Sequence, residues 1–454
     1  MDDAHNVNSS SPGSQWTREQ ARQIRRRPEN VAPVAEPSGA DPFPELHIWD
    51  TWLLRDRDGK IADVNGQQVA FSLTADAALL PGTRHDVAEI RCFHSTDGEH
   101  WCDAGPVFDD GALGQRQWAG SALYDAGELY LYYTAAGHDD DEELTYTQRI
   151  AVAYGGTLAT DADGIDLTGP WTHETLLEPD GEWYETEAQS RGMTYTFRDP
   201  WFFEDPATGE MHLLFEANTP TLKRDGDNSE TNKRRAFNGC VGVATSSSDD
   251  PLSWELQPPL LTAVEVNQEL ERPHIVTVDD NYYLFFCSHV HTFAPGVTGP
   301  DGLYGFVADA FEGPYRPLNK TGLVATNPEE TPFQAYSWMA FKYNEEVLLQ
   351  SFLNYYDFTG TSLDTVAEFP EHEQRARFGG TLAPTLRLRI DGDETQLIGA
   401  LDPWQIPTLN EHLPPADGSP LSDSNFTETI REGGVHNEYR IDSLSGSEYD
   451  EPLS

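Results

Sequence analysis

The stretch Phe202–Ala217, FFEDPATGEMHLLFEA, decides the fold, because two aromatic-rich segments flank a short polar turn. Alternating apolar residues on both sides of such a turn are typical of a β-hairpin. The same pattern recurs at three other places: ALYDAGELYLYYTA from Ala122, IVTVDDNYYLFFCS from Ile275 and AFKYNEEVLLQSF from Ala340. The chain is therefore predicted to be built from repeated hairpins.

The repeats have a regular interval. Their anchors fall near residues 50, 118, 199, 271 and 336, at a spacing of about 70 residues. Radial repetition of antiparallel sheets gives such a period, and the innermost strand of each sheet then faces a central channel. Five anchors predict an all-β protein, a five-bladed β-propeller with a central axial active-site pocket.

Helix signals are few. Thr17 and Gln20 form a predicted capping box for a short N-terminal helix over Trp16–Ile24, before Pro28.

We expect one catalytic domain over residues 16–411. Residues 1–15 and 412–454 are polar, the latter also acidic, and we expect both ends to be flexible or weakly ordered.

Three carboxylates stand in distinctive contexts: Asp50 in IWDTW, Asp199 in FRDPWFF and Glu271 in LERPHIV. Each begins a predicted strand, so all three would converge on the central channel. Retaining cleavage of a glycosidic bond uses one carboxylate as nucleophile and one as acid, about 5–5.5 Å apart. Any one motif alone could be a structural ion pair, since Arg198 and Arg272 stand beside two of the carboxylates. The three together favour sugar chemistry.

The composition is strongly acidic. Asp and Glu number 77 against 29 Lys and Arg, which gives a formal net charge of -48. Molar salt shortens the screening length to about 3 Å and would relieve this self-repulsion. We therefore expect a halophilic, high-salt environment; an acidic cytosolic protein or a cation-binding surface are the alternatives. Nucleic acid is an improbable partner because its phosphates would meet like charge.

Other signals are weak. No apolar run is long enough to span a membrane, and no secretory signal peptide is recognisable. We expect no metal and no cofactor, since the histidines and the four cysteines lack a metal-ligand spacing. Cys92 and Cys102 flank a predicted turn and could face each other, but we expect free thiols.

Many short strings, in order, resemble those of glycoside hydrolase family 68, the levansucrases, inulosucrases and related β-fructofuranosidases. They run from Trp16 to Pro407 and include WTREQA, IWDTWLLRDRDG, QWAGSALY, QRIAVAYG, FRDPWFFEDPATGE, VNQELERPH, YYLFFCSH, TGPDGLYGFV, GPYRPLN and RFGGTLAPTLRL. The family fold is a five-bladed propeller with a deep axial pocket, which agrees with the repeat. The chain resembles in particular the inulosucrase-like members of haloarchaea, and they would suit the charge.

The resemblance implies a role for each site residue. Asp50 would be the nucleophile, Glu271 the acid and then the base, and Asp199 the stabiliser of the transition state. The substrate-binding residues would be Trp49, Trp118, Ser121, Arg198, Glu269, Arg272, His289 and Tyr336. Glu269 would raise the pKa of Glu271 by like-charge repulsion if both face the pocket.

The chain also departs from the family pattern. Ala119 stands where the family usually carries a Ser that orients the nucleophile, so Ser121 is a candidate replacement donor. Leu53 replaces a common Pro. Members with a calcium site carry Asp where this chain has Gln268 and Met193, so we predict no bound calcium. His289, rather than Arg, follows the Gram-negative-like branch.

These features predict a sucrose-dependent fructosyltransferase that makes fructan or fructooligosaccharides, with some hydrolysis. Its partners would be sucrose and oligosaccharide acceptors, it would act as a monomer, and the family role suggests an extracellular location. A purely hydrolytic β-fructofuranosidase or an arabinan-cleaving propeller enzyme is the first alternative. The alternative of another class is a carbohydrate-binding propeller without catalysis, for which a missing carboxylate would be the mark.

The charge generates a first prediction. Self-repulsion of a -48 chain should make its thermal unfolding midpoint and its activity rise steeply between dilute buffer and roughly 3 M NaCl or KCl, since salt screens that repulsion. Differential scanning fluorimetry over a salt series would measure the midpoint. A midpoint that stays flat over the series would contradict a halophilic protein.

Overall fold

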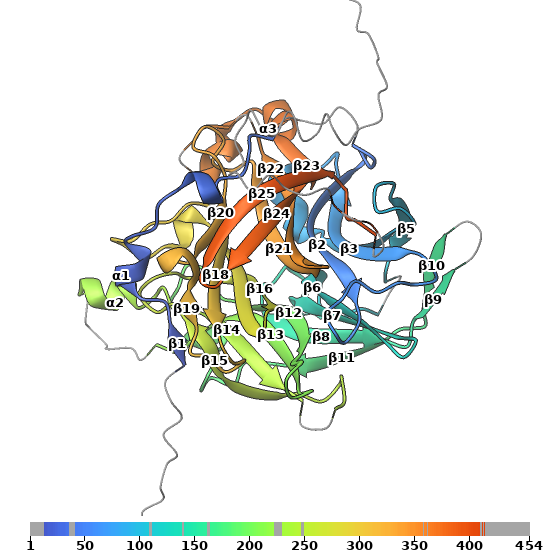
Figure 1. Cartoon of the computed structure of the whole chain (residues 1–454), viewed down its shortest axis with the longest axis horizontal. Helices are drawn as coiled ribbons and strands as arrows, with labels where there is room; N and C mark the ends of the chain where they lie inside the picture. Colours follow the sequence, from blue (N-terminus) through green and yellow to red (C-terminus); the bar gives the residue numbers. More distant parts are fainter. Residues whose placement is uncertain are drawn as a thin grey trace, which may run out of the picture.

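The computed structural model describes residues 13–35, 41–108, 111–138, 140–160, 164–221, 229–246, 249–356, 358–360, 362–408, 411 and 413. Most of this chain is β-strand, arranged as antiparallel sheets around a common centre (Figure 1). Most of the expected segments 1–15 and 412–454 lie outside the described residues.

Five units of four to six strands follow one another along the chain. The first contains β2 (Leu46–Arg55), β3 (Gln68–Asp76), β4 (Glu89–Ser95) and β5 (Cys102–Pro106). The second contains β6 (Arg116–Asp125), β7 (Glu128–Ala136), β8 (Gln148–Tyr154) and β11 (Thr172–Leu177), with the hairpin β9 (Thr157–Thr160) and β10 (Ile165–Thr168) inserted.

The third unit contains β12 (Phe197–Glu204), β13 (Met211–Asn218), β14 (Gly239–Thr245) and β15 (Glu255–Thr262). The fourth contains β16 (Glu271–Val278), β17 (Asn281–Ser288), β18 (Gly302–Ala308), β19 (Arg316–Pro317) and β20 (Leu323–Thr326). The fifth contains β21 (Ala335–Tyr343), β22 (Glu346–Tyr355), β23 (Phe378–Leu382), β24 (Pro384–Asp391) and β25 (Glu394–Pro403).

The first strand of each unit, β2, β6, β12, β16 or β21, lies near the centre, whereas β5, β11 and β15 lie toward the outside (Figure 1). β2 and β6 pair in parallel through Leu54 and Ala122, which joins the first two units into one sheet. Hydrogen bonds link other first strands: the Phe202 amide donates to Ser121 Oγ, and the Arg272 guanidinium donates to the Thr51 and Ser337 carbonyls. The first strands are thus fixed to one another as well as to their own sheets.

The chain after β25 returns to the first unit. Trp101 Nε1 donates to the Trp404 carbonyl at 2.8 Å, and the Ile406 amide donates to the Gly98 carbonyl at 2.8 Å. A Cβ on Gly98 would lie 2.0 Å from that Ile406 carbonyl oxygen, and Gly98 has a φ of +75°, so only glycine fits this contact. The last unit is in this way fastened to the first.

Apolar clusters fill the space between neighbouring sheets. One lies between the second and third units and includes Tyr132, Phe202 and Phe215. Another lies between the third and fourth units and includes Trp201 and Phe286, together with Trp16 from the N-terminal segment. Face-to-face packing of aromatic-rich strands explains why the sequence repeat is so rich in Phe and Tyr.

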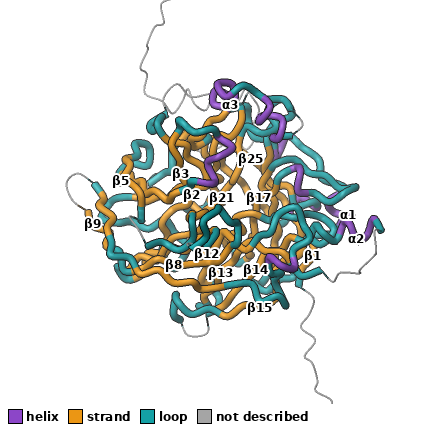
Figure 2. Tube along the Cα trace, turned by 180° about the vertical axis from the view of Figure 1, so that it is seen from behind, coloured by secondary structure: helices purple, strands orange, loops and turns teal. Residues whose placement is uncertain are grey.

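Helices are short and peripheral (Figure 2): α1 (Arg18–Ala21), α2 (Glu230–Arg234) and α3 (Glu371–Arg377). The predicted capping box is confirmed, because Thr17 Oγ1 accepts from the Gln20 amide and Gln20 Oε1 accepts from the Thr17 amide. The helix is shorter than the predicted range. Trp16 is outside it because its amide donates to the Thr262 carbonyl, next to the β1–β15 pairing.

One boundary needs correction. Ser14 and Gln15 form β1 and pair in parallel with Leu261 and Thr262 of β15. These two residues therefore belong to the third sheet and not to a flexible N-terminal segment, where we expected them. The four cysteines are free thiols, with Cys102 exposed. No helix in the described part of the chain is long and apolar enough to cross a membrane.

Candidate active site

Every first strand is interrupted by a β-bulge at an equivalent place. The pairing shifts between Ile48 and Thr51, Trp118 and Gly120, Arg198 and Trp201, Glu271 and His274, and Tyr336 and Met339. A bulge adds an unpaired residue and re-aims the neighbouring side chains. All three predicted carboxylates lie at these bulges.

Three bulge residues have left-handed backbones: Asp199 has a φ of 60°, Arg272 of 50° and Ser337 of 60°. Residues other than glycine rarely adopt this conformation, so the surrounding contacts must hold it. The Asp199 amide donates to Thr134 Oγ1 at 2.8 Å, and Asp199 Oδ2 accepts from the Arg272 amide at 3.1 Å. Thr134 of the second unit thus holds the backbone of Asp199, and the Arg272 amide of the fourth unit holds its carboxylate.

Arg198 lies at the centre of a cluster of carboxylates. Its guanidinium is 2.6 Å from Glu216 Oε2, 3.0 Å from Glu271 Oε1, 3.6 Å from Glu269 Oε1 and 3.9 Å from Asp199 Oδ2. These acids raise the pKa of Arg198 well above its ordinary value against the opposing effect of burial. Arg198 therefore stays charged.

The pKa of Asp199 is raised to about 7: burial is the largest cause, the Arg198 charge opposes it, and the charges of Asp50 and Glu271 add to it. These effects arise because the three predicted carboxylates are close to one another, although they come from three different sheets. Asp50 is half-buried on β2, and its charge also acts on Arg84 of the 3-10 turn Pro81–Asp86. The structure thus brings the three predicted carboxylates close together.

Glu271 is held on both oxygens. Oε1 accepts from Arg198, and Oε2 accepts from the Tyr336 hydroxyl and lies 3.8 Å from His289 Nε2. Burial and then the Glu271 charge raise the pKa of Tyr336 well above its ordinary value, so Tyr336 remains a donor. The expected effect of Glu269 on Glu271 stays a prediction.

His289 is stacked on Tyr336 with ring centroids 3.7 Å apart and the planes inclined by 14°. Its Nδ1 lies 2.7 Å from Oδ2 of the buried Asp301. Burial lowers the pKa of His289, but the charge and hydrogen bond of Asp301 and the charge of Glu271 outweigh burial and raise the pKa to about 9. At neutral pH a second cation therefore stands beside Glu271.

Aromatic walls complete the site. Trp49 is almost fully buried, with its ring 5.5 Å from His85, and Trp118 Nε1 donates to the His85 carbonyl at 3.0 Å. Arg84 lies 5.6 Å from the Trp49 ring. The turn Pro81–Asp86 therefore borders the site, which the sequence did not indicate.

A protein-family model described as Levansucrase/Invertase, glycoside hydrolase family 68, matches residues 5–405. The chain belongs to glycoside hydrolase family 68. The chain is also similar to a solved structure, an inulosucrase from Halalkalicoccus jeotgali bound to kestose. The two are 57% identical over 89% of this chain and 100% of that one, with a TM-score of 0.87.

Other family 68 relatives differ in their named activities. A levansucrase from Pseudomonas savastanoi is 35% identical over 87% of this chain and 96% of its own length. The catalytic domain of a β-fructofuranosidase from Microbacterium saccharophilum is 30% identical over 89% of this chain and 95% of that one, with a TM-score of 0.75. The family resemblance inferred from the sequence motifs is confirmed.

Two predicted substrate-binding residues of this family 68 chain are corrected. Ser121 is fully buried, and its Oγ accepts from the Phe202 amide between β6 and β12, so it is not open to a substrate. Arg272 is also buried, and its guanidinium donates to Ser337 Oγ at 2.7 Å and the Thr51 carbonyl at 2.7 Å. Arg272 therefore braces three first strands and positions Asp199 through its amide.

Three functional residues escaped the sequence reasoning: Glu216, Asp301 and Thr134. Glu216 lies in the second hairpin strand directly opposite Arg198, so the register of the hairpin FRDPWFF/HLLFEA was the signal that could have found it. Asp301 lies in the string TGPDGLYGFV, twelve residues after His289, and no local pattern connects the two. Thr134 reads as an ordinary strand residue.

Gln268 and Met193 stand where family members with a calcium site carry Asp. Gln268 is buried, with its Nε2 donating to the Thr194 carbonyl at 2.9 Å, and Met193 is exposed. Across the described residues, no group of three or more His, Cys, Asp or Glu could hold a metal ion.

The pKa of His289 generates a prediction. A raised pKa means that the folded state binds the proton more tightly, so its stabilisation is fully present below the unfolded value of about 6.5 and is lost as pH rises through about 9. His289→Gln should therefore lower the unfolding midpoint most below pH 6.5 and progressively less up to pH 9. Thermal melts of both proteins over this range measure the difference.

The matched variants are His289→Arg and His372→Gln. The first keeps a cation at all these pH values and should lose the alkaline decline, whereas the second removes an exposed imidazole on α3. A His289→Gln difference that is the same at every pH would contradict the assigned charge.

Proposed function

We propose that this family 68 enzyme transfers the fructosyl group of sucrose by a double displacement, with Asp50 as nucleophile, Glu271 as acid and base, and Asp199 as stabiliser of the transition state. The convergence of these three carboxylates from three sheets carries the proposal. Family 68 contains sucrose fructosyltransferases, and relatives named inulosucrase and levansucrase cover nearly the whole chain.

In the first step Asp50 attacks the anomeric carbon of the fructosyl unit while Glu271 donates a proton to the departing glucosyl oxygen. A fructosyl ester on Asp50 remains and glucose leaves. In the second step Glu271 removes a proton from the acceptor, which attacks the same carbon and frees Asp50. Two inversions give retention.

The hydrogen bonds support these roles. Arg198 and Tyr336 fix both oxygens of Glu271, so the carboxyl group keeps one orientation while its proton moves. Arg198 is shared by several clustered carboxylates, and burial together with their mutual repulsion raises the pKa of Asp199 and of Glu216.

The rigid placement of Asp199 supports its role. Its carboxylate is held by the Arg272 amide and sits in a buried place. When ionised, the Asp199 carboxylate is a fixed negative charge beside the developing oxocarbenium ion, and it stabilises the transition state without reorganisation. Trp49 and Trp118 would form the walls against the fructosyl ring, and Glu269 and His289 would contact the glucosyl part.

The arrangement of five units of four to six strands around central first strands supports a five-bladed propeller, with one catalytic domain over residues 14–411. We also propose that the protein acts as a monomer outside the cell at high salt. A relative from Zymomonas mobilis is named extracellular sucrase, and it is 33% identical over 87% of this chain.

A hydrolytic β-fructofuranosidase is the second candidate, because family 68 structures of that name match this chain at about 30% identity. The two candidates differ in the acceptor. We propose transfer, with inulin-type β-2,1 linkages. The reason is that the inulosucrase relative is 57% identical to this chain and the match spans the whole of the inulosucrase.

Product analysis distinguishes the candidates. The purified enzyme in high salt should release clearly more glucose than free fructose from sucrose, since transferred fructosyl groups remain in oligosaccharides. Chromatography gives the two sugars, and methylation analysis gives the linkage. Equal amounts of glucose and fructose at every sucrose concentration would favour the hydrolase, and β-2,6 bonds would overturn the linkage alone.

A covalent intermediate tests the mechanism. Glu271→Ala should lower kcat on sucrose by roughly 10²–10⁴, because acid and base catalysis are both lost. A fructosyl donor with an activated leaving group needs no acid, so only the second step should remain slow. Mass spectrometry should then show the enzyme heavier by one fructosyl unit, with the adduct on the peptide that contains Asp50.

Two controls complete this experiment. Azide needs no base and should release the adduct as a fructosyl azide of retained configuration. Asp50→Asn should show no adduct. An adduct on Asp199, or inversion by direct attack of water, would overturn the assignment of roles but not the family.

A further inference from the structure

A cavity of about 330 Å³ lies at the opposite ends of the first strands from the carboxylates. It is lined by the last residues of β2, β12, β16 and β21 and by the turn after β2, and none of the site residues discussed above lines it. Arg55 follows Asp50 by five residues on β2. At about 3.3 Å per residue, the cavity is roughly 16 Å from the proposed nucleophile.

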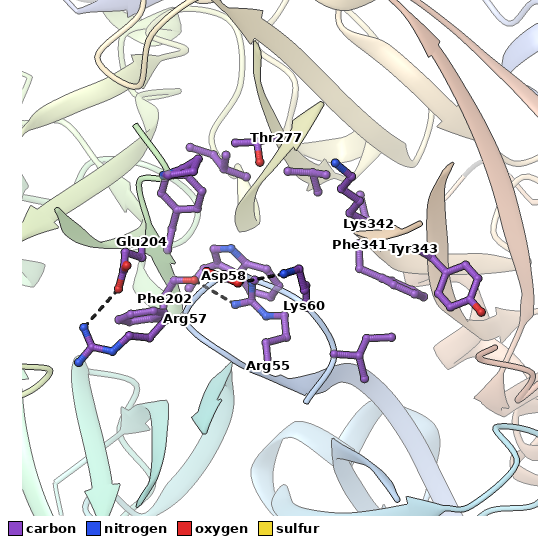
Figure 3. A pocket seen from close by; sticks show the side chains of 18 of the residues that line it. Arg55, Arg57, Asp58, Lys60, Phe202, Glu204, Thr277, Phe341, Lys342 and Tyr343 are labelled. Carbon is purple, nitrogen blue, oxygen red and sulfur yellow. Dashed lines mark hydrogen bonds and ion pairs between the residues drawn. The ribbon is translucent and has the colours of Figure 1, made fainter. Parts of the chain in front are cut away.

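The cavity is basic on a very acidic chain. Four cationic side chains line it, Arg55, Arg57, Lys60 and Lys342, against the two carboxylates Asp58 and Glu204 (Figure 3). The whole chain has only five lysines, and two of them are here. A concentration of positive charge at one place is unusual for a protein of net charge -48.

Two of the cations are already balanced. Arg57 is turned toward Glu204 (Figure 3) and also forms ion pairs of 2.7 Å with Asp125 and Asp249. Lys60 pairs with Asp58 at 2.9 Å, and both of these side chains are exposed. Neither cation needs a further partner.

Arg55 is different. It points into the cavity (Figure 3), it is only 5% exposed, and no carboxylate within the described residues forms an ion pair with it. Its Nη2 donates to the Phe202 carbonyl at 3.0 Å, and its guanidinium carbon lies 3.4 Å from the centre of the Trp201 ring. Burial lowers the pKa of Arg55 to about 9, and only the neighbouring Asp56 opposes that effect.

Two donors in the cavity wall lack a partner. Arg55 Nε and Trp201 Nε1 are both buried, and neither donates a hydrogen bond to any residue that the structure describes. Trp201 is 4% exposed. A buried donor without an acceptor is costly, and an uncompensated buried cation is more so. Both orphaned atoms of the lining are donors, which indicates that an acceptor with negative charge is the complementary group.

We infer that this cavity is an anion-binding site, in which Arg55 Nε and Trp201 Nε1 donate to a small anion, either a halide or one oxygen of an oxyanion. Lys342, which is exposed and has no ion pair in the described chain, attracts the anion at the entrance. The apolar walls from Ile275, Val276 and Phe341 exclude competing water. The cavity exceeds the volume of about 30 Å³ that one water occupies, so an anion and some of its water fit together.

The bound anion would have a structural effect. Arg55 contacts the third unit through Phe202 and Trp201, while the fourth and fifth units form the other walls of the cavity. An anion there neutralises the buried guanidinium and ties together four first strands at the end opposite the carboxylates. The chain would then need specific anions in addition to general screening by salt.

Anomalous diffraction tests the position. Crystals of the whole chain grown with sodium bromide, and others with sodium selenate, should show in one of the two an anomalous peak within hydrogen-bonding distance of Arg55 Nε and Trp201 Nε1. Bromide reports a halide site and selenate an oxyanion site. An empty cavity in both crystals would overturn the inference.

Solution measurements test the donors. At constant high ionic strength, replacement of gluconate by chloride, or by sulfate, should raise the unfolding midpoint of the wild type in a saturable way. Arg55→Gln and Trp201→Phe should each weaken the apparent affinity by roughly tenfold, the loss expected for one charge-assisted or one buried hydrogen bond. Trp201→Phe keeps an aromatic ring under the guanidinium, so it separates the donor from the ring contact.

If Arg55→Gln does not fold, Lys342→Gln replaces it in the anion titration. This variant should weaken the apparent affinity for the anion severalfold. Arg316→Gln is the matched control, because it removes an exposed charge on β19 that pairs with Asp309, away from the cavity lining. An anion effect of equal size in the wild type, Trp201→Phe, Lys342→Gln and Arg316→Gln would show general salt screening alone and would overturn the site.

Discussion

The active site depends on one guanidinium, that of Arg198. Arg198 lies within 4 Å of Glu216, Glu269, Glu271 and Asp199, and these acids come from three strands of two sheets and from the loop before β16. Without this cation, four carboxylates would repel one another in a place with little water. With it, each carboxylate is attracted to Arg198, but the cluster as a whole still has an excess of negative charge. Burial and that excess charge raise the pKa of Asp199 and Glu216, while Arg198 opposes the rise.

The bulges deliver the acids to Arg198. A regular strand would place alternate side chains on opposite faces, and no two sheets would present a carboxylate to the same point with the required orientation. The left-handed backbones of Asp199, Arg272 and Ser337 turn these residues at one level of the five first strands. The Arg272 side chain then holds β2 and β21 in place, while its amide binds Asp199. Strain at one residue is thus supported by contacts from its neighbours.

The two ends of the first strands have opposite character. Carboxylates gather at the end where sugar chemistry is proposed, and Arg55 with two lysines gathers at the other. The chain as a whole has a net charge of -48. Salt would therefore act on this protein in two ways: it screens the acidic surface, and it provides the anion that the inferred cavity binds. The first effect depends on ionic strength, while the second depends on the identity of the anion.

Much of the fold and of the candidate site could be predicted from residues that are close together in the chain. Local alternation predicted the hairpins, and the four-residue capping box from Thr17 to Gln20 predicted the helix start. Asp50, Asp199 and Glu271 were found because each stands in a short, distinctive string, although Asp50 lies in the middle of β2 and not at its beginning as predicted. Composition determined the charge. These features depend on residues close together in the chain, so a linear reading is sufficient for them.

Only the tertiary structure decided which side chains meet. Glu216 and Asp301 became part of the site through contacts across strands, Ser121 was buried between two sheets, and the Arg272 side chain was used for bracing and not for substrate. The pairing of Arg55 with Trp201 was equally invisible. All of these depend on strand register, and each bulge shifts the register by one residue and so changes the face on which later side chains lie. Such a shift has no reliable local pattern, because the contacts that stabilise it come from other sheets.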